Sequence, residues 1–99
     1  MILEHALIDV QPERADEFAS ALARARAVIA AAPGFASLAL HRGIESPSRY
    51  LLLVEWETLE AHTEGFRASP AFADWRSIIG PFFASPPAVD HYAPVPGLP

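Results

Sequence analysis

The chain of 99 residues contains no cysteine, no lysine and no asparagine. Without cysteine it can form no disulfide, thiolate metal site or thiol nucleophile. It has seven arginines and twelve acidic residues, which give a net charge of −5. This negative charge argues against nucleic acid or an anionic membrane as partner. No apolar run is long enough to cross a bilayer, and "MILEHALIDV" lacks the basic start and unbroken apolar core of a signal peptide. A soluble, cytoplasmic protein is expected.

Apolar residues are abundant, at 52% of the chain, which exceeds the usual share for a globular domain. The length fits one domain over residues 1–99, with a core of about 2–93 and a proline-rich tail at 94–99. A short chain leaves much of its surface uncovered when it folds alone, and monomers rarely expose large apolar patches. Part of the apolar surface is therefore expected to meet another chain.

The spacing of apolar residues predicts four strands and two helical regions. The runs at 2–10, 35–43, 49–57 and 88–95 are rich in apolar and β-branched residues and are bounded by turn residues. A helix begins near Pro12, carries apolar residues at helical spacing and stops at Pro33-Gly34. Thr58 is a plausible N-cap for a segment through Arg67, and Ser69-Pro70 is typical of a second helix start.

The order β-α-β-β-α-β predicts an α+β fold of the ferredoxin-like type, with a four-stranded antiparallel sheet. Both helices would cover one face of this sheet and leave the other bare. Leucines at both parities of the strands put apolar side chains on both faces, so the bare face would need a cover. Two sheets packed face to face would supply it, which predicts a homodimer that encloses a sheet-lined chamber.

Three stretches follow in order: "VEWETLEAH" at 54–62, "SPAFADWR" at 69–76 and "PFFASPPAVDHY" at 81–92. They combine an acidic-Trp strand end, a helix with His, a Ser-Pro-aromatic restart and a Pro-Pro turn into a last strand. In these features the chain resembles the antibiotic biosynthesis monooxygenase domain, a branch of the dimeric α+β barrel proteins. The resemblance implies a homodimer with a small aromatic or quinol ligand.

The resemblance also implies oxygenation without flavin or metal. An electron-rich phenol or hydroquinone is deprotonated, its anion passes an electron to dioxygen, and the two radicals recombine. The protein would supply a dry cavity, a general base and donors for the oxyanion. No cofactor and no metal are therefore expected. Haem is disfavoured because Trp75 and Arg76 stand where haem-degrading relatives carry an axial His, and the chain lacks the Asn donor of other characterised relatives.

Histidine is the natural general base because its ordinary pKa lies close to working pH. The first and last strands are expected to be neighbours, so His5 and His91 would be adjacent if their register and facing agree. Glu55 points away from Trp56, toward the chamber if Trp56 packs under the helices. The catalytic candidates are His5 first, His91 second, Glu55 as an orienting partner, and His41.

His62 corresponds to a His that many relatives carry on this helix, and its structural interpretation is a partly buried residue that fastens the helix start. A strand histidine likewise has a structural alternative as a solvated or hydrogen-bonded residue. The aromatics Trp56, Phe72, Trp75 and Tyr92 are predicted to lie in the core. The four histidines show no H-x-H or H-E-x-x-H spacing, which gives little support for a metal site.

Three functions remain open from the sequence. The first is a cofactor-independent monooxygenase acting on a small aromatic or quinol. The second is a proton-transferring isomerase or cyclase in the same chamber, which would need no oxygen. The third is a small-ligand-binding module without turnover.

Overall fold

A computed structural model describes residues 1–98; Pro99, the last residue of the predicted tail, lies outside the described residues. The strands are β1 (Ile2–Asp9), β2 (Phe35–Arg42), β3 (Arg49–Trp56) and β4 (Ala88–Tyr92). The main helices are α1 (Ala15–Ala30) and α2 (Pro70–Ile79). Three short helical turns flank them: η1 (Pro12–Arg14) before α1, η2 (Ala61–Phe66) before α2 and η3 (Gly80–Phe82) after α2. The predicted ferredoxin-like α+β order is confirmed.

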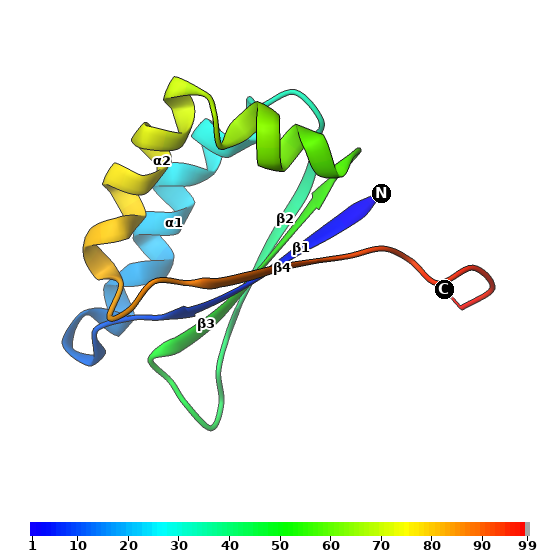
Figure 1. The fold of residues 1–99 in the computed structure, drawn as a ribbon. Helices are drawn as coiled ribbons and strands as arrows, with labels where there is room; N and C mark the ends of the chain where they lie inside the picture. The colour runs from blue at the N-terminus through cyan, green and yellow to red at the C-terminus, as the bar shows by residue number, and fades with distance from the viewer. Residues whose placement is uncertain (99) are drawn as a thin grey trace.

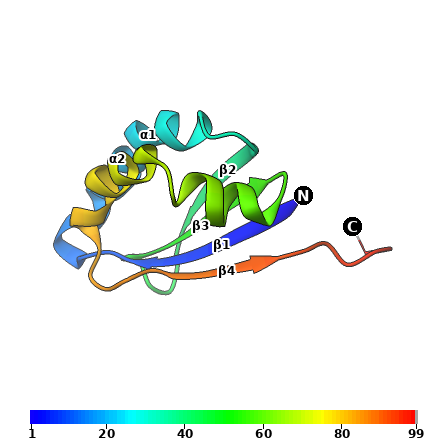
Figure 2. The same ribbon diagram turned by 45° about the horizontal axis from the view of Figure 1, so that its top comes forward.

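The four strands form one antiparallel sheet in the order β2-β3-β1-β4. Both main helices cover the same face of this sheet, as Figures 1 and 2 show from two directions. Side chains alternate along each strand, so every second residue of β1 and β3 packs beneath the helices. Trp56 is fully buried and Trp75 is buried, as predicted. Within residues 1–98, no helix has the length and apolarity to cross a membrane.

After β3 the chain forms two separate helical pieces, η2 and α2. Thr58 Oγ1 accepts the N–H of Ala61 at 3.1 Å, as predicted for an N-cap, and η2 then takes π-helical geometry. The backbone is extended at Ser69, and α2 begins at Pro70 as expected. Ser69 does not cap α2 through its side chain, because its hydroxyl donates back to the carbonyl of Phe66 at 2.7 Å. The break lets η2 and α2 take separate directions over the sheet (Figure 1).

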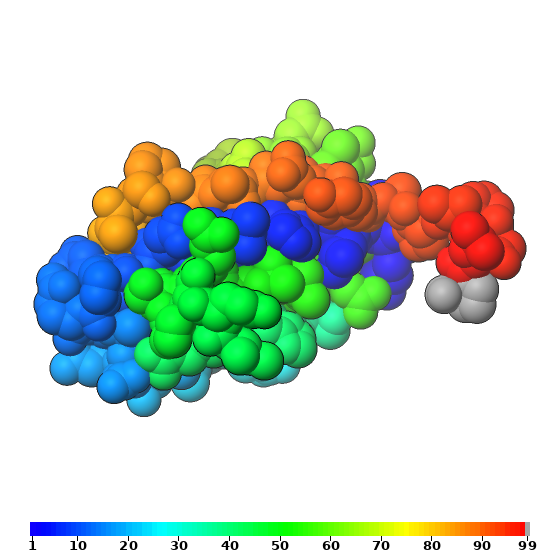
Figure 3. Space-filling model, turned by 90° about the horizontal axis from the view of Figure 1, so that it is seen from below, coloured from blue at the N-terminus to red at the C-terminus, as the bar shows by residue number. Residues whose placement is uncertain are grey.

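The opposite face of the sheet carries no helix. In Figure 3, β4, β1 and β3 lie side by side on this bare face. Tyr92 was predicted as a core aromatic, but it is 52% exposed here, with its ring centroid 5.6 Å from that of His5. The prediction was wrong because alternation along β4 turns Val89 and His91, not Tyr92, toward the helices. The bare face includes Leu3, His5, Leu7, Leu51, Leu53, Glu55 and Tyr92.

Candidate functional site

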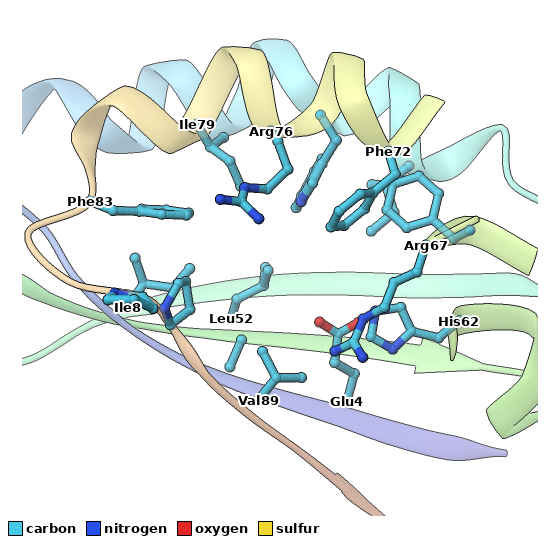
Figure 4. Close-up of a pocket in the computed structure, with 16 residues that line it drawn as sticks. Glu4, Ile8, Leu52, His62, Arg67, Phe72, Arg76, Ile79, Phe83 and Val89 are labelled. Atoms are coloured by element: carbon cyan, nitrogen blue, oxygen red, sulfur yellow. The ribbon is translucent and has the colours of Figure 1, made fainter. Parts of the chain in front are cut away.

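A cavity of about 270 Å³ lies between the helix-covered face of the sheet and α2 (Figure 4). Its walls are mostly apolar. Four ionisable side chains also line it: Glu4, His62, Arg67 and Arg76. A largely apolar pocket with a few polar groups is the usual form of a small-molecule site. Apolar wall residues include Ile8, Leu52, Phe72, Trp75, Phe83 and Val89.

Glu4 is an acid on the buried side of β1. It shares its parity with Ala6 and Ile8, so the strand turns it toward the helices, where it is only 6% exposed. Its Oε1 accepts the indole N–H of Trp56 at 3.0 Å and lies 3.4 Å from Nε2 of His62. Both contacts use Oε1, which leaves Oε2 for a molecule in the cavity. Figure 4 shows the carboxyl at the lower wall of the cavity, near His62.

His62 links the carboxyl to the last strand. It comes from η2, is 3% exposed, and its Nδ1 lies 2.8 Å from Nε2 of His91. One of these two nitrogens carries the shared proton. Trp56, Glu4, His62 and His91 thus form one continuous polar cluster that joins β3, β1, η2 and β4. His91 is half-buried, so the cluster reaches from the cavity toward solvent.

Burial controls the ionisation of this cluster. It raises the pKa of Glu4, an effect that the hydrogen bond from Trp56 and the charge of Arg67 partly offset. Burial, followed by the charges of Arg67 and His91, lowers the pKa of His62 to about 4. The pKa of His91 is also lowered, by burial first and then by Arg67. At neutral pH His62 is therefore uncharged, and its contact with Glu4 is not an ion pair.

Of the four residues proposed as catalytic from the sequence, only His91 lies in this cluster. His91 pairs with Glu4 across β1 and β4, whereas His5 pairs with Asp90, so the two histidines face opposite sides of the sheet. The condition for their adjacency is not met. Glu55 faces the bare side, as expected from the burial of Trp56.

Within residues 1–98, no hydrogen bond, ion pair or aromatic ring contact joins any two of the other three candidates, His5, His41 and Glu55. Glu55 accepts a hydrogen bond from Ser37 Oγ at 2.8 Å, and His41 is exposed on β2. His5 contacts the ring of Tyr92. Whether any of these residues takes part in catalysis stays a prediction.

Sequence reasoning missed Glu4 and Arg67, and it gave His62 only a structural role. A signal for Glu4 was present, because an acid at the same strand parity as Ala6, Ile8 and Val10 has to be buried if that face packs on helices. Its partners could not be read from the sequence, since Trp56, His62 and His91 are far from it along the chain. In residues 1–98, no three His, Asp or Glu side chains are grouped as ligands for a metal ion.

Comparisons with known proteins identify the family. A family model described as "Antibiotic biosynthesis monooxygenase" matches residues 1–77. The YczJ protein of Bacillus subtilis is 37% identical over 95 residues, which cover 96% of this chain and all of that protein. The chain belongs to the antibiotic biosynthesis monooxygenase family.

Two solved structures extend this result. A Bordetella bronchiseptica protein named for the antibiotic biosynthesis monooxygenases is 46% identical, with a TM-score of 0.92 over 95% of this chain and 96% of the other. SnoaB of Streptomyces nogalater, a cofactor-independent oxygenase, is 21% identical, with a TM-score of 0.81 over 99% of this chain and 96% of the other. At that identity SnoaB shares the fold, and family membership rests on the closer matches.

Proposed function

We propose that this antibiotic biosynthesis monooxygenase family member oxidises a small phenol or quinol without a cofactor, in the cavity under α2, with Glu4 as general base. The observation that carries the proposal is a buried carboxyl of raised pKa at the wall of an apolar cavity. Burying an acid is costly, and groups with perturbed pKa values in cavities are concentrated at functional sites. A carboxyl whose pKa is moved toward neutrality is also a better base at working pH.

The size of the cavity limits the substrate. An apolar cavity of about 150 Å³ holds one benzene, and drug-sized ligands occupy about 300–1,000 Å³. At about 270 Å³, the cavity fits a molecule of one or two fused rings. Naphthols and monocyclic hydroquinones are therefore better candidates than substrates of three or four fused rings.

The reaction needs one proton acceptor and one positive charge near the substrate oxygen. Glu4 Oε2 accepts the phenolic proton, and the guanidinium of Arg67 stabilises the phenolate. The phenolate gives one electron to dioxygen, and phenoxyl radical and superoxide combine at the para carbon. The resulting peroxide takes the first proton back. Loss of the para C–H proton and cleavage of the O–O bond then give the quinone, and the departing hydroxide combines with that proton as water.

The atoms and electrons balance without a reductant. One 1-naphthol and one dioxygen become one 1,4-naphthoquinone and one water, and the substrate supplies the electrons. His62 and His91 connect Glu4 to solvent through contacts of 3.4 Å and 2.8 Å. Glu4 is ionised again once the peroxide has taken its proton back, and this connection would let the site exchange protons with solvent.

The test compares Glu4→Gln with Glu13→Gln by oxygen uptake against a panel of naphthols, hydroquinones and anthrones. Glutamine keeps an acceptor for the Trp56 N–H, so the fold should survive. We expect Glu4→Gln to lower kcat about 10²–10⁴-fold, the usual contribution of a general base. Glu13→Gln, the same substitution at an exposed acid of η1 that does not line the cavity, is the matched control and should keep near-native activity. Full activity in Glu4→Gln would exclude Glu4 as the base.

A second candidate function is a proton-transferring isomerase or cyclase. The Glu4–His62–His91 chain can move protons whether or not oxygen is present, and the chain has no Asn as an oxygen-orienting donor. Turnover of a substrate under argon at the rate seen in air would favour this function. Turnover only in air favours the oxygenase.

We also propose that two chains pack through their bare sheet faces to form a homodimer. The support is the run of exposed or half-buried leucines on the bare face of β1 and β3 and the family membership. In such a dimer His5, His41 and Glu55 would line the interface chamber, and His5 would be the alternative base. The same oxygen assay on His5→Gln and Glu4→Gln separates the two sites.

A further inference from the structure

We infer that the substrate carries a carboxylate at the end opposite its phenolic hydroxyl, and that Arg76 binds this carboxylate. The inference rests on the proposed function for the identity of the reacting end. The binding of an anionic aromatic molecule can nevertheless be measured without any turnover.

Arg76 is a solvent-exposed residue of α2 whose side chain lines the cavity between two aromatic rings. Its guanidinium carbon lies 5.9 Å from the ring centroid of Phe72 and 5.8 Å from that of Phe83. Figure 4 shows the guanidinium on the Phe83 side of the cavity, away from Glu4. The two rings hold the cation at the cavity wall through cation–π contacts and leave its N–H groups for a ligand.

The charge of Arg76 has no counterion in the described part of the chain. Arg14, Arg42 and Arg49 each pair with a carboxylate, whereas no ion pair and no side-chain hydrogen bond of the other four arginines occurs within residues 1–98. Of these four, Arg67 and Arg76 line the cavity. The protein as a whole carries −5, so its overall field repels anions. A cation at the cavity wall would offset this repulsion for an anionic ligand.

A second cation of the cavity, Arg67, is committed to the other end. Its charge acts on Glu4, His62 and His91, where it shifts all three pKa values downward. The cavity thus has a reactive end with Glu4 and Arg67, an apolar middle, and a separate guanidinium at Arg76. Guanidinium binds a carboxylate through two parallel N–H···O bonds, which a neutral group cannot match. These features together fit a hydroxyaryl carboxylate of one or two rings.

The experiment measures binding by calorimetry under argon, so that no ligand is consumed. The ligands are 5-hydroxy-2-naphthoate and its neutral isostere 5-hydroxy-2-naphthamide, each titrated into the wild-type protein, Arg76→Gln, Arg76→Lys and Arg24→Gln. Arg24 is exposed on α1 and does not line this cavity, so it is the matched control. Melting temperatures of all variants check that each is folded.

We expect the wild-type protein to bind the carboxylate about tenfold or more tightly than the carboxamide, as for one charge-assisted contact. This ratio should fall to about one in Arg76→Gln, be partly kept in Arg76→Lys and be unchanged in Arg24→Gln. Equal binding of the two ligands to the wild-type protein, or an unchanged ratio in Arg76→Gln, would overturn the inference. So would the absence of carboxylate binding at millimolar concentration.

If Arg76→Gln does not fold, Arg76→Lys carries the assignment to Arg76, and equal binding of the two ligands to the wild-type protein would still overturn the inference. The outcome is also separable from that of the proposed function. A preserved carboxylate preference without oxygen uptake would contradict the oxygenase and leave Arg76 as an anion site. Oxygen uptake with 1-naphthol but no preference for the carboxylate would do the reverse.

Discussion

The imidazole of His62 stacks on the indole of Trp56, with ring centroids 5.2 Å apart and planes inclined by 18°. The indole N–H meanwhile donates to Glu4 at 3.0 Å. A residue predicted as a core anchor thus also holds two members of the candidate site in place. Stability and chemistry are coupled at this position, and they can be separated by the choice of substitution.

Trp56→Ala should lower the free energy of unfolding by about 3–5 kcal/mol, as for other large buried aromatics. Trp56→Phe keeps a ring and should cost less, but it removes the donor to Glu4. Because that hydrogen bond lowers the pKa of Glu4, its loss should raise this pKa further. The acidic limb of the kcat/KM profile should then move to higher pH in Trp56→Phe. Urea denaturation and the pH–rate profile check both parts, and an unmoved acidic limb would argue against Glu4 as the base.

Phe72 was predicted to lie in the core together with Trp56, but it is less buried than Trp56 and its truncation should cost less. It is half-buried, lies edge-on to Phe66 at 5.5 Å and forms part of the cavity wall. Phe72→Ala should therefore destabilise less than Trp56→Ala and weaken binding of naphthol-sized ligands. Thermal melts and calorimetry on the same samples test this. A loss of stability equal to that of Trp56→Ala would return Phe72 to the core.

The fold was predictable because its signals are local. Strand alternation, Thr58 as a cap and the Ser69-Pro70 restart each act over a few residues, and together they give the order of elements. The site was less predictable because it joins four elements through side chains. The choice of catalytic candidates depended on which face of β1 lines the site. Glu4 and His5 are neighbours in sequence, yet Glu4 lines the cavity and His5 lies on the bare face.

The low pKa of His62 makes stability depend on pH. The unfolded chain takes up a proton on His62 near pH 6.5, whereas the folded protein resists this down to about 4. Between these values only the unfolded state gains the proton, so stability falls as pH is lowered through this window. Over this window the free energy of unfolding falls by on the order of 3 kcal/mol at most, because each pKa unit of difference between the folded and unfolded states corresponds to about 1.4 kcal/mol.

Urea denaturation at about pH 7 and about pH 5 tests this dependence. His62→Gln should show a smaller loss than the wild-type protein over the same interval. Glu4 acts in the opposite direction, because its raised pKa favours the protonated folded state, so Glu4→Gln should steepen the loss at low pH. Equal slopes in His62→Gln and the wild-type protein would contradict the assignment.

The bare sheet face predicts the oligomeric state. Stable interfaces bury about 1,600 Å² in total, and a four-stranded sheet face on each partner is of that order. Light scattering should therefore report twice the chain mass of 10.7 kDa.

Leu7→Glu, at a leucine 36% exposed on the bare face, should give the mass of one chain, because a buried unpaired carboxylate opposes association. Leu59→Glu, at a leucine 39% exposed beside η2, should leave the dimer intact. A wild-type monomer at micromolar concentration would remove the interface chamber, and with it the alternative base His5, while leaving the cavity of Glu4 within each chain unaffected.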